Sequence, residues 1–190
     1  MKIAQTDLVI VPGYTGADPD HWQSRWLSKM GTARLVHQTD WHKPERELWV
    51  ESLLSALREN DRPAVIVAHS LGCQVAVLAA QEFDEALRRK VRGAFLVAPP
   101  DVENPTIRPR HLMTFGPYPR ERLPFPSIVV ASRDDGFCEY EKAEEMASAW
   151  GSMLVDARES GHINTASGQG PWPDGMMLFA NFMSKLNGTH

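Results

Sequence analysis

The chain has 190 residues, of which 43% are hydrophobic and 23% charged, and these values exclude a disordered or fibrous protein. The length favours a single domain spanning residues 1–190. Lys and Arg number 20 against 24 Asp and Glu, and this net charge of −4 offers no basic surface for nucleic acid. The first apolar run, residues 8–11, is too short for a signal peptide or a membrane span, so we expect a cytoplasmic protein that binds no membrane.

Short apolar runs alternate with stretches of helical periodicity along the chain. The runs are rich in Val, Ile and Leu and mostly lack alternation, which is typical of strands buried on both faces of a parallel sheet. The predicted strands cover residues 7–11, 33–36, 64–68, 93–97, 127–131 and 152–155. The predicted helices cover residues 20–30, 44–59, 71–84, 139–150 and 176–186. This order predicts a three-layer α/β/α sandwich around a parallel sheet of about six strands.

A glycine-containing loop, residues 12–16, follows the first predicted strand. It lacks the third glycine of a dinucleotide-binding loop and the Gly-Lys-Ser/Thr of a P-loop, which argues against a nucleotide site. The next helix is expected to begin with Asp20 as its N-cap. Trp22 and Trp26 share one face of that helix, and we expect them to pack in the core or at a rim.

The third predicted strand runs straight into His69-Ser70-Leu71-Gly72, and a helical pattern starts immediately afterwards. A strand, a serine between small residues and then a helix is the context of the nucleophile elbow G-x-S-x-G. Ala68 replaces the first glycine of that motif. The alternative interpretation is that Ser70 only caps the helix, since serine is a favoured N-cap.

A serine nucleophile needs a histidine base and a carboxylate that orients it, which follow in the order Ser, Asp or Glu, His in this fold. Asp134 and Asp135 follow the fifth predicted strand, and His162 follows the sixth. We favour Asp135 because it directly precedes a glycine and the next helix, whereas Asp134 could cap the turn. His69 is a poor base because neighbouring side chains diverge on such a turn.

Hydrolysis of an acyl group also needs two N–H donors for the oxyanion. We predict the backbone N–H groups of Leu71 and Tyr14, with Gly13 allowing the close approach of the two loops. This requires the first and third strands to be neighbours, with the second strand outside the first. Gly13, His69 and Trp41 are the candidate substrate contacts.

Eight of the 14 prolines lie between Pro99 and Pro126, where helical periodicity is weak. Proline fits neither a helix interior nor a central strand, so this segment is not regular structure. Two interpretations stay open: a meandering surface crossover, or a loop that overhangs the site and serves as a small lid. As a small lid, the segment would leave the pocket open and its selectivity for substrates modest.

Together, in this order, residues 12–13, 20–22, 69–72, 134–137 and 161–162 resemble the small serine hydrolases of the retinoblastoma-binding protein 9 family. The resemblance covers nearly the whole chain and implies a compact α/β-hydrolase fold with no large cap domain. It also implies that the second aspartate of the pair, Asp135, is the catalytic carboxylate.

The sequence therefore predicts a serine hydrolase acting on small carboxylic esters, thioesters or amides through Ser70, His162 and Asp135. No metal or organic cofactor is expected, because the other histidines lack metal-ligand spacing and the chemistry needs none. Cys73 and Cys138 form no C-x-x-C pair and are expected to be buried or idle thiols. The alternative is a non-catalytic module that binds a protein partner on the same fold.

Overall fold

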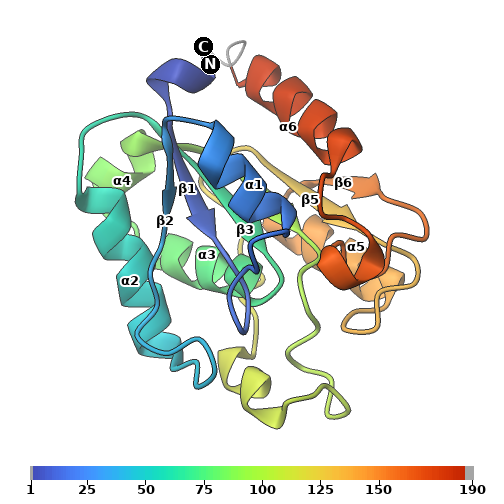
Figure 1. Ribbon diagram of the computed structural model, residues 1–190. Coiled ribbons are helices and arrows are strands. Elements are labelled where there is room, and N and C mark those ends of the chain that lie inside the picture. The colour runs from blue at the N-terminus through green and yellow to red at the C-terminus, as the bar shows by residue number, and fades with distance from the viewer. Residues whose placement is uncertain (1, 187–190) are drawn as a thin grey trace.

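The computed structural model describes residues 2–186 and contains a central sheet with helices on both faces (Figure 1). All strand pairs are parallel, in the order β2-β1-β3-β4-β5-β6. The strands are β1 Asp7–Val11, β2 Ala33–Leu35, β3 Ala64–His69, β4 Val91–Val97, β5 Ser127–Ala131 and β6 Met153–Asp156. The predicted three-layer α/β fold with a six-stranded parallel sheet and no large cap is confirmed.

Helices cover both faces of the sheet because its strands are apolar on both faces. Leu8 and Ile10 of β1 pack with the helices on one face, while Val9 and Val11 pack with those on the other. The first face carries α1 Trp22–Lys29 and α6 Pro173–Lys185. The opposite face carries α2 Arg46–Arg58, α3 Leu71–Gln81, α4 Glu85–Lys90 and α5 Tyr140–Trp150. Short 3-10 helices occupy η1 Ile3–Gln5, η2 Arg110–Phe115 and η3 Thr165–Ser167.

The tryptophans of α1 are core residues, as expected. Trp22 and Trp26 are buried and lie edge to face, with ring centroids 4.8 Å apart. Trp172 at the start of α6 packs against both rings. Burying one aromatic or aliphatic side chain contributes about 2 kcal/mol, so this cluster is a main attachment of α1 and α6 to the sheet.

The starts of α1, α4 and α6 differ from the predictions for local reasons. Helix α1 begins at Trp22 because the His21 side chain, not Asp20, accepts the hydrogen bond from the Gln23 amide (3.1 Å). Helix α4 was not predicted, although its Asp84 cap accepts from the Leu87 amide (2.8 Å), since its residues run on from the preceding helical pattern. Helix α6 begins at Pro173 rather than residue 176, because proline suits the first turn of a helix.

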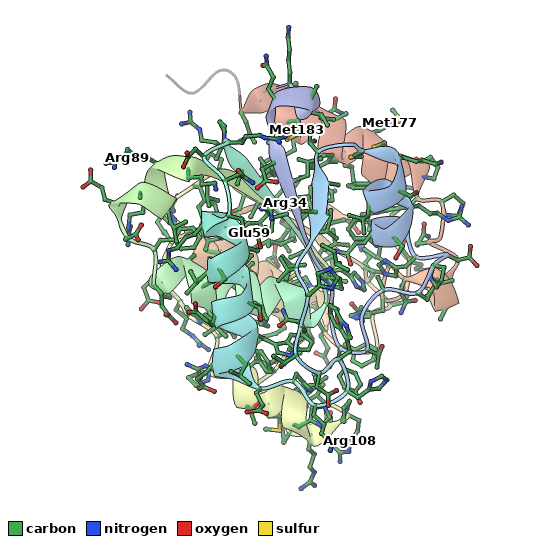
Figure 2. The ribbon with its side chains drawn as sticks, turned by 60° about the vertical axis from the view of Figure 1, so that its left-hand side comes forward. Arg34, Glu59, Arg89, Arg108, Met177 and Met183 are labelled. Carbon is green, nitrogen blue, oxygen red and sulfur yellow. The ribbon has the colours of Figure 1, made fainter. Side chains whose placement is uncertain are left out.

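The proline-rich segment between β4 and β5 is anchored to the core along its length. Its buried side chains are Val102, Ile107, Leu112, Phe115, Tyr118, Leu123 and Phe125. The Trp150 ring N–H also donates to the Pro119 carbonyl (2.8 Å). Arg108 points away from the body of the protein near the tip of the segment (Figure 2). The segment is thus a packed crossover, and η2 brings Leu112 to the carboxyl edge of the sheet.

Candidate active site

Ser70 occupies a strained turn between β3 and α3. Its φ of 53° and ψ of −127° lie where side-chain-bearing residues rarely occur, and such strain concentrates at functional sites. The turn is possible because the chain has glycine at two positions that pack closely around it, Gly72 and Gly13. A Cβ added at Gly72 would lie 2.2 Å from the Val11 carbonyl oxygen, and one at Gly13 would lie 2.7 Å from Ser70 Cβ.

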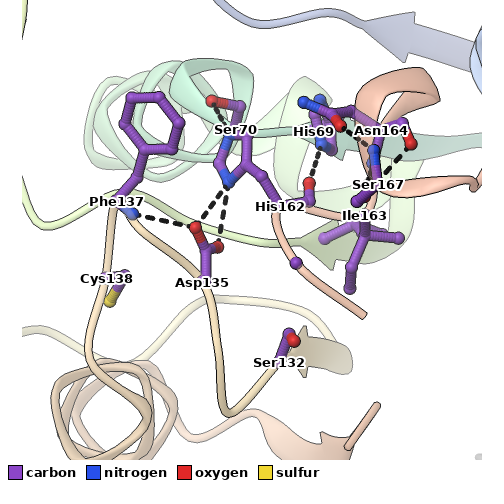
Figure 3. Close-up of polar contacts among 12 residues, drawn as sticks. His69, Ser70, Ser132, Asp135, Phe137, Cys138, His162, Ile163, Asn164 and Ser167 are labelled. Carbon is purple, nitrogen blue, oxygen red and sulfur yellow. Dashed lines mark hydrogen bonds and ion pairs between the residues drawn. The ribbon is translucent and has the colours of Figure 1, made fainter. Parts of the chain in front are cut away.

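A hydrogen-bonded chain links the serine hydroxyl to a carboxylate (Figure 3). His162 Nε2 lies 2.8 Å from Ser70 Oγ, and His162 Nδ1 lies 2.9 Å from both carboxylate oxygens of Asp135. The Ser70 side chain makes no capping hydrogen bond to α3. The structure therefore brings the three predicted side chains together, and the hydroxyl faces the imidazole rather than the helix.

The neighbouring aspartates have different partners. Asp134 accepts hydrogen bonds from the Ser132 hydroxyl (2.6 Å) and the Gly161 amide (2.8 Å), which lower the pKa of its carboxyl group. The side chain of Asp135 is almost inaccessible and accepts a hydrogen bond from the Phe137 amide (2.9 Å) in addition to the imidazole. Asp134 thus holds the loop that carries the histidine, and Asp135 contacts the histidine itself.

The first loop and the start of α3 approach each other closely beside Ser70. Leu71 is the first residue of α3, and a Cβ at Gly13 would lie 3.1 Å from its amide nitrogen, which shows how closely the first loop approaches the helix. Within residues 2–186, neither the Leu71 nor the Tyr14 amide has a hydrogen-bond acceptor. Unpaired donors at the positive end of a helix are suited to stabilise negative charge.

Ser70 opens onto a cavity of about 230 Å³. Its apolar wall comes from Tyr14, Leu112 and Phe137, whose ring lies 4.4 Å from that of His162. Its polar wall comprises Thr15, Asp18, His21, His69, Asn164 and Thr165. Most of this lining was not predicted from the sequence. Leu112 comes from a segment without periodicity. Among the polar residues, only Asp18 gives a local signal, because it stands shortly after the first loop.

The three candidate substrate contacts lie in different places. Gly13 lies directly behind Ser70. The His69 ring is buried in the cavity wall and lies within hydrogen-bonding distance of the His162 carbonyl oxygen (2.9 Å). Trp41 does not line this cavity; it lines a second one of about 170 Å³ and packs edge-on against Trp49. The two cavities share only Thr15 and Gly16, so the structure does not bring Trp41 to Ser70.

Both cysteines are buried thiols whose pKa is raised by burial. Cys73 lies in the first turn of α3 and donates to the Val97 carbonyl (3.3 Å), away from the chain of hydrogen bonds at Ser70. In the described part of the chain, no cluster of three or more His, Cys, Asp or Glu side chains could hold a metal ion. None of the helices described is long and apolar enough to cross a membrane.

Comparisons with known proteins identify the family and the fold. The structure of a YdeN-like hydrolase from Pectobacterium atrosepticum is 31% identical, with a TM-score of 0.83 over 96% of this chain and 92% of that chain. The B. subtilis ydeN gene product is 20% identical, with a TM-score of 0.75 over 95% and 99%. Esterase 2 of Thermogutta terrifontis is 18% identical, with a TM-score of 0.69 over 98% and 86%. Among curated proteins there is no match. The serine hydrolase family model matches residues 8–181, and the chain belongs to this family.

Proposed function

We propose that the protein hydrolyses small carboxylic esters, thioesters or amides through an acyl-enzyme intermediate on Ser70. The observation that carries this proposal is the continuous chain of hydrogen bonds from Asp135 through His162 to Ser70, with spacings of 2.9 and 2.8 Å. A serine hydroxyl is a weak nucleophile until an oriented base removes its proton, and this chain supplies both the base and its orientation.

The proposed reaction has two matching halves. Ser70 Oγ attacks the acyl carbonyl while His162 Nε2 takes the hydroxyl proton, and the carbonyl electron pair moves onto the oxygen. The N–H groups of Leu71 and Tyr14 receive this oxyanion, and one such donor contributes about 3 kcal/mol in comparable enzymes. The intermediate then expels the leaving group, which takes the proton from His162. Water repeats the sequence on the acyl-enzyme and frees Ser70.

The cavity favours a small substrate. A buried space of about 150 Å³ accommodates benzene, so about 230 Å³ suits a short acyl group with part of its leaving group. Asp135 holds the imidazole through Nδ1 and stabilises its charged form, so the chemistry requires no added cofactor. We also propose that the protein is a close relative of the retinoblastoma-binding protein 9 family. It would be a single domain located in the cytoplasm.

The decisive experiment is active-site labelling with a fluorophosphonate probe, followed by mass spectrometry of the labelled peptide. We expect wild-type protein to carry the label on Ser70 and the Ser70→Ala variant to carry none. Turnover of p-nitrophenyl esters is expected to fall about 10⁶-fold in Ser70→Ala and in His162→Ala. Label retained in Ser70→Ala would overturn the mechanism. A folded wild type that takes no label would favour the protein-binding module instead.

A further inference from the structure

The loop that carries His162 adopts a backbone conformation that its sequence disfavours. Gly161 and Ile163, on either side of the histidine, have φ values of 55° and 48°. Glycine tolerates this region, but a β-branched residue such as isoleucine rarely enters it. Ile163 is fully buried, so its side chain is fixed as well. Surrounding contacts must therefore hold this loop in place.

Two ring nitrogens from outside the loop bind its consecutive carbonyl groups. His69 Nε2 lies 2.9 Å from the His162 carbonyl oxygen, as Figure 3 shows, and Trp22 Nε1 lies 3.0 Å from that of Ile163. A carbonyl only accepts hydrogen bonds, so both rings donate and His69 carries its proton on Nε2. His69 ends β3 and Trp22 begins α1, so both donors belong to the rigid framework of the sheet and its covering helix.

Both donors are themselves fixed by packing. The His69 ring lies 4.8 Å from His21 and 5.0 Å from His162, and Trp22 lies 4.8 Å from Trp26. Burial, together with the neighbouring histidines, keeps the pKa of His69 well below its ordinary value, so the ring stays neutral. Both rings are buried, so loss of either hydrogen bond would leave a buried N–H group unpaired, which proteins avoid.

We propose that His69 and Trp22 are positioning residues, which clamp the backbone at His162 and Ile163 so that the His162 imidazole meets Ser70 in reactive geometry. This inference rests on the proposed function. The clamp acts through the main chain, because the carbonyl that His69 binds belongs to the base itself. A displacement of about 1 Å at a reacting group can cost about 100-fold in rate, so loss of a donor is expected to affect turnover.

Four variants test the clamp. His69→Leu removes the donor with little change in volume, whereas His69→Gln supplies an amide N–H at a similar reach. Trp22→Phe removes the second donor. Phe182→Leu is the matched control, since Phe182 belongs to the same apolar cluster and its ring packs on Phe95 rather than on either donor. The readouts are the rate of fluorophosphonate labelling at Ser70, kcat and KM for p-nitrophenyl acetate, and thermal unfolding.

We expect His69→Leu to lower both the labelling rate and kcat by about 10- to 100-fold with KM changed little, and His69→Gln to restore most of the loss. Trp22→Phe should act in the same direction, whereas Phe182→Leu should lower the unfolding temperature and leave kcat unchanged. The downfield Nδ1 proton resonance of His162 should shift in His69→Leu and return in His69→Gln. A purely structural role would not give this recovery.

The outcomes separate the two proposals. If wild-type protein takes no label, the proposed function fails, whatever the variants do. If wild type is labelled and folded His69→Leu reacts at the wild-type rate, the clamp is refuted. It is also refuted if His69→Gln is folded and as slow as His69→Leu, because the donor is then not the cause. If His69→Leu does not fold, Trp22→Phe decides the question by the same readouts.

Discussion

The two edges of the sheet carry similar polar side chains in different arrangements. At the amino edge, Asp7 receives two hydrogen bonds from the Arg34 guanidinium (2.7 and 2.6 Å) and one from Asn60 (3.0 Å). Arg34 also pairs with Glu59, which lies beside it in Figure 2. Burial opposes ionisation of Asp7, but these donors outweigh it and hold the pKa of this carboxyl group below its ordinary value.

At the carboxyl edge, the buried carboxylate of Asp135 is paired with an imidazole, and the chain of hydrogen bonds ends on the Ser70 hydroxyl at a cavity. A guanidinium stays charged and does not take up or release a proton near neutral pH, whereas an imidazole can do both. Asp7 and Asp135 have similarly buried side chains, so what distinguishes them is the partner that each one binds.

The largest expected effect separates the two adjacent aspartates. Asp135→Asn should lower kcat/KM for p-nitrophenyl esters about 10⁴-fold, because the amide no longer favours the required imidazole tautomer. Asp134→Asn is the matched control and should lose far less activity, since Asp134 binds Ser132 and the Gly161 amide rather than the ring. Equal losses in the two variants would contradict this division of roles.

A second prediction concerns the space behind the serine. Gly13→Ala should lower kcat/KM about 100-fold, because the new methyl group displaces Ser70 and the Leu71 N–H donor. Gly136→Ala is the control, since no atom lies within 4 Å of a Cβ at that position. Steady-state kinetics with one short-chain ester compares the two variants. A fully active Gly13→Ala variant would contradict the prediction, because the backbone at Ser70 would then have shifted to accommodate the methyl group.

A substitution at the amino edge of the sheet should change the stability of the protein and not its turnover. Asp7→Asn is expected to cost about 2 kcal/mol in the free energy of unfolding at pH 7, because Arg34 loses its main partner. A carboxyl group with a lowered folded pKa stabilises above its unfolded pKa of about 4, and this contribution is lost on acidification. Urea unfolding at pH 7 and pH 3 should therefore show a smaller difference between wild type and variant at the lower pH. A loss of kcat in Asp7→Asn would contradict the prediction that the amino edge contributes only to stability.

The smallest effect is expected from a buried histidine at the carboxyl edge. Burial lowers the pKa of His21 to about 4, and nearby Asp18 offsets this only in part. The unfolded chain takes up this proton near pH 6.5, so the contribution of His21 falls by about 1 kcal/mol between pH 7.5 and 5.5. His21→Asn keeps an acceptor for the Gln23 amide and should flatten that part of the stability curve. The same exchange at exposed His37 is the control and should leave the curve unchanged.

The sequence identified the parts of the site that depend on local pattern. Ser70 stands in a strand-turn-helix context, and the later strands place Asp135 and His162 at the same edge of the sheet. The roles of His69 and Trp22 could not be derived in this way, since their bonds cross 93 and 141 residues. Asp20, with Gln23 three residues on, has the pattern of a helix cap, whereas the structure uses the ring of His21.

The distances along the chain also bear on refolding. Ser70 and His162 are separated by 92 residues, and Asp135 and His162 by 27, so the proposed base lies in the loop that follows the last strand of the sheet. A chain that has paired only β1 to β4 contains the strained serine and its amide donors but no base. Far-ultraviolet circular dichroism would already report much of its helix. Recovered hydrolase activity should therefore be the stricter measure of refolding, because we expect it only after β6 and the loop that follows it have docked.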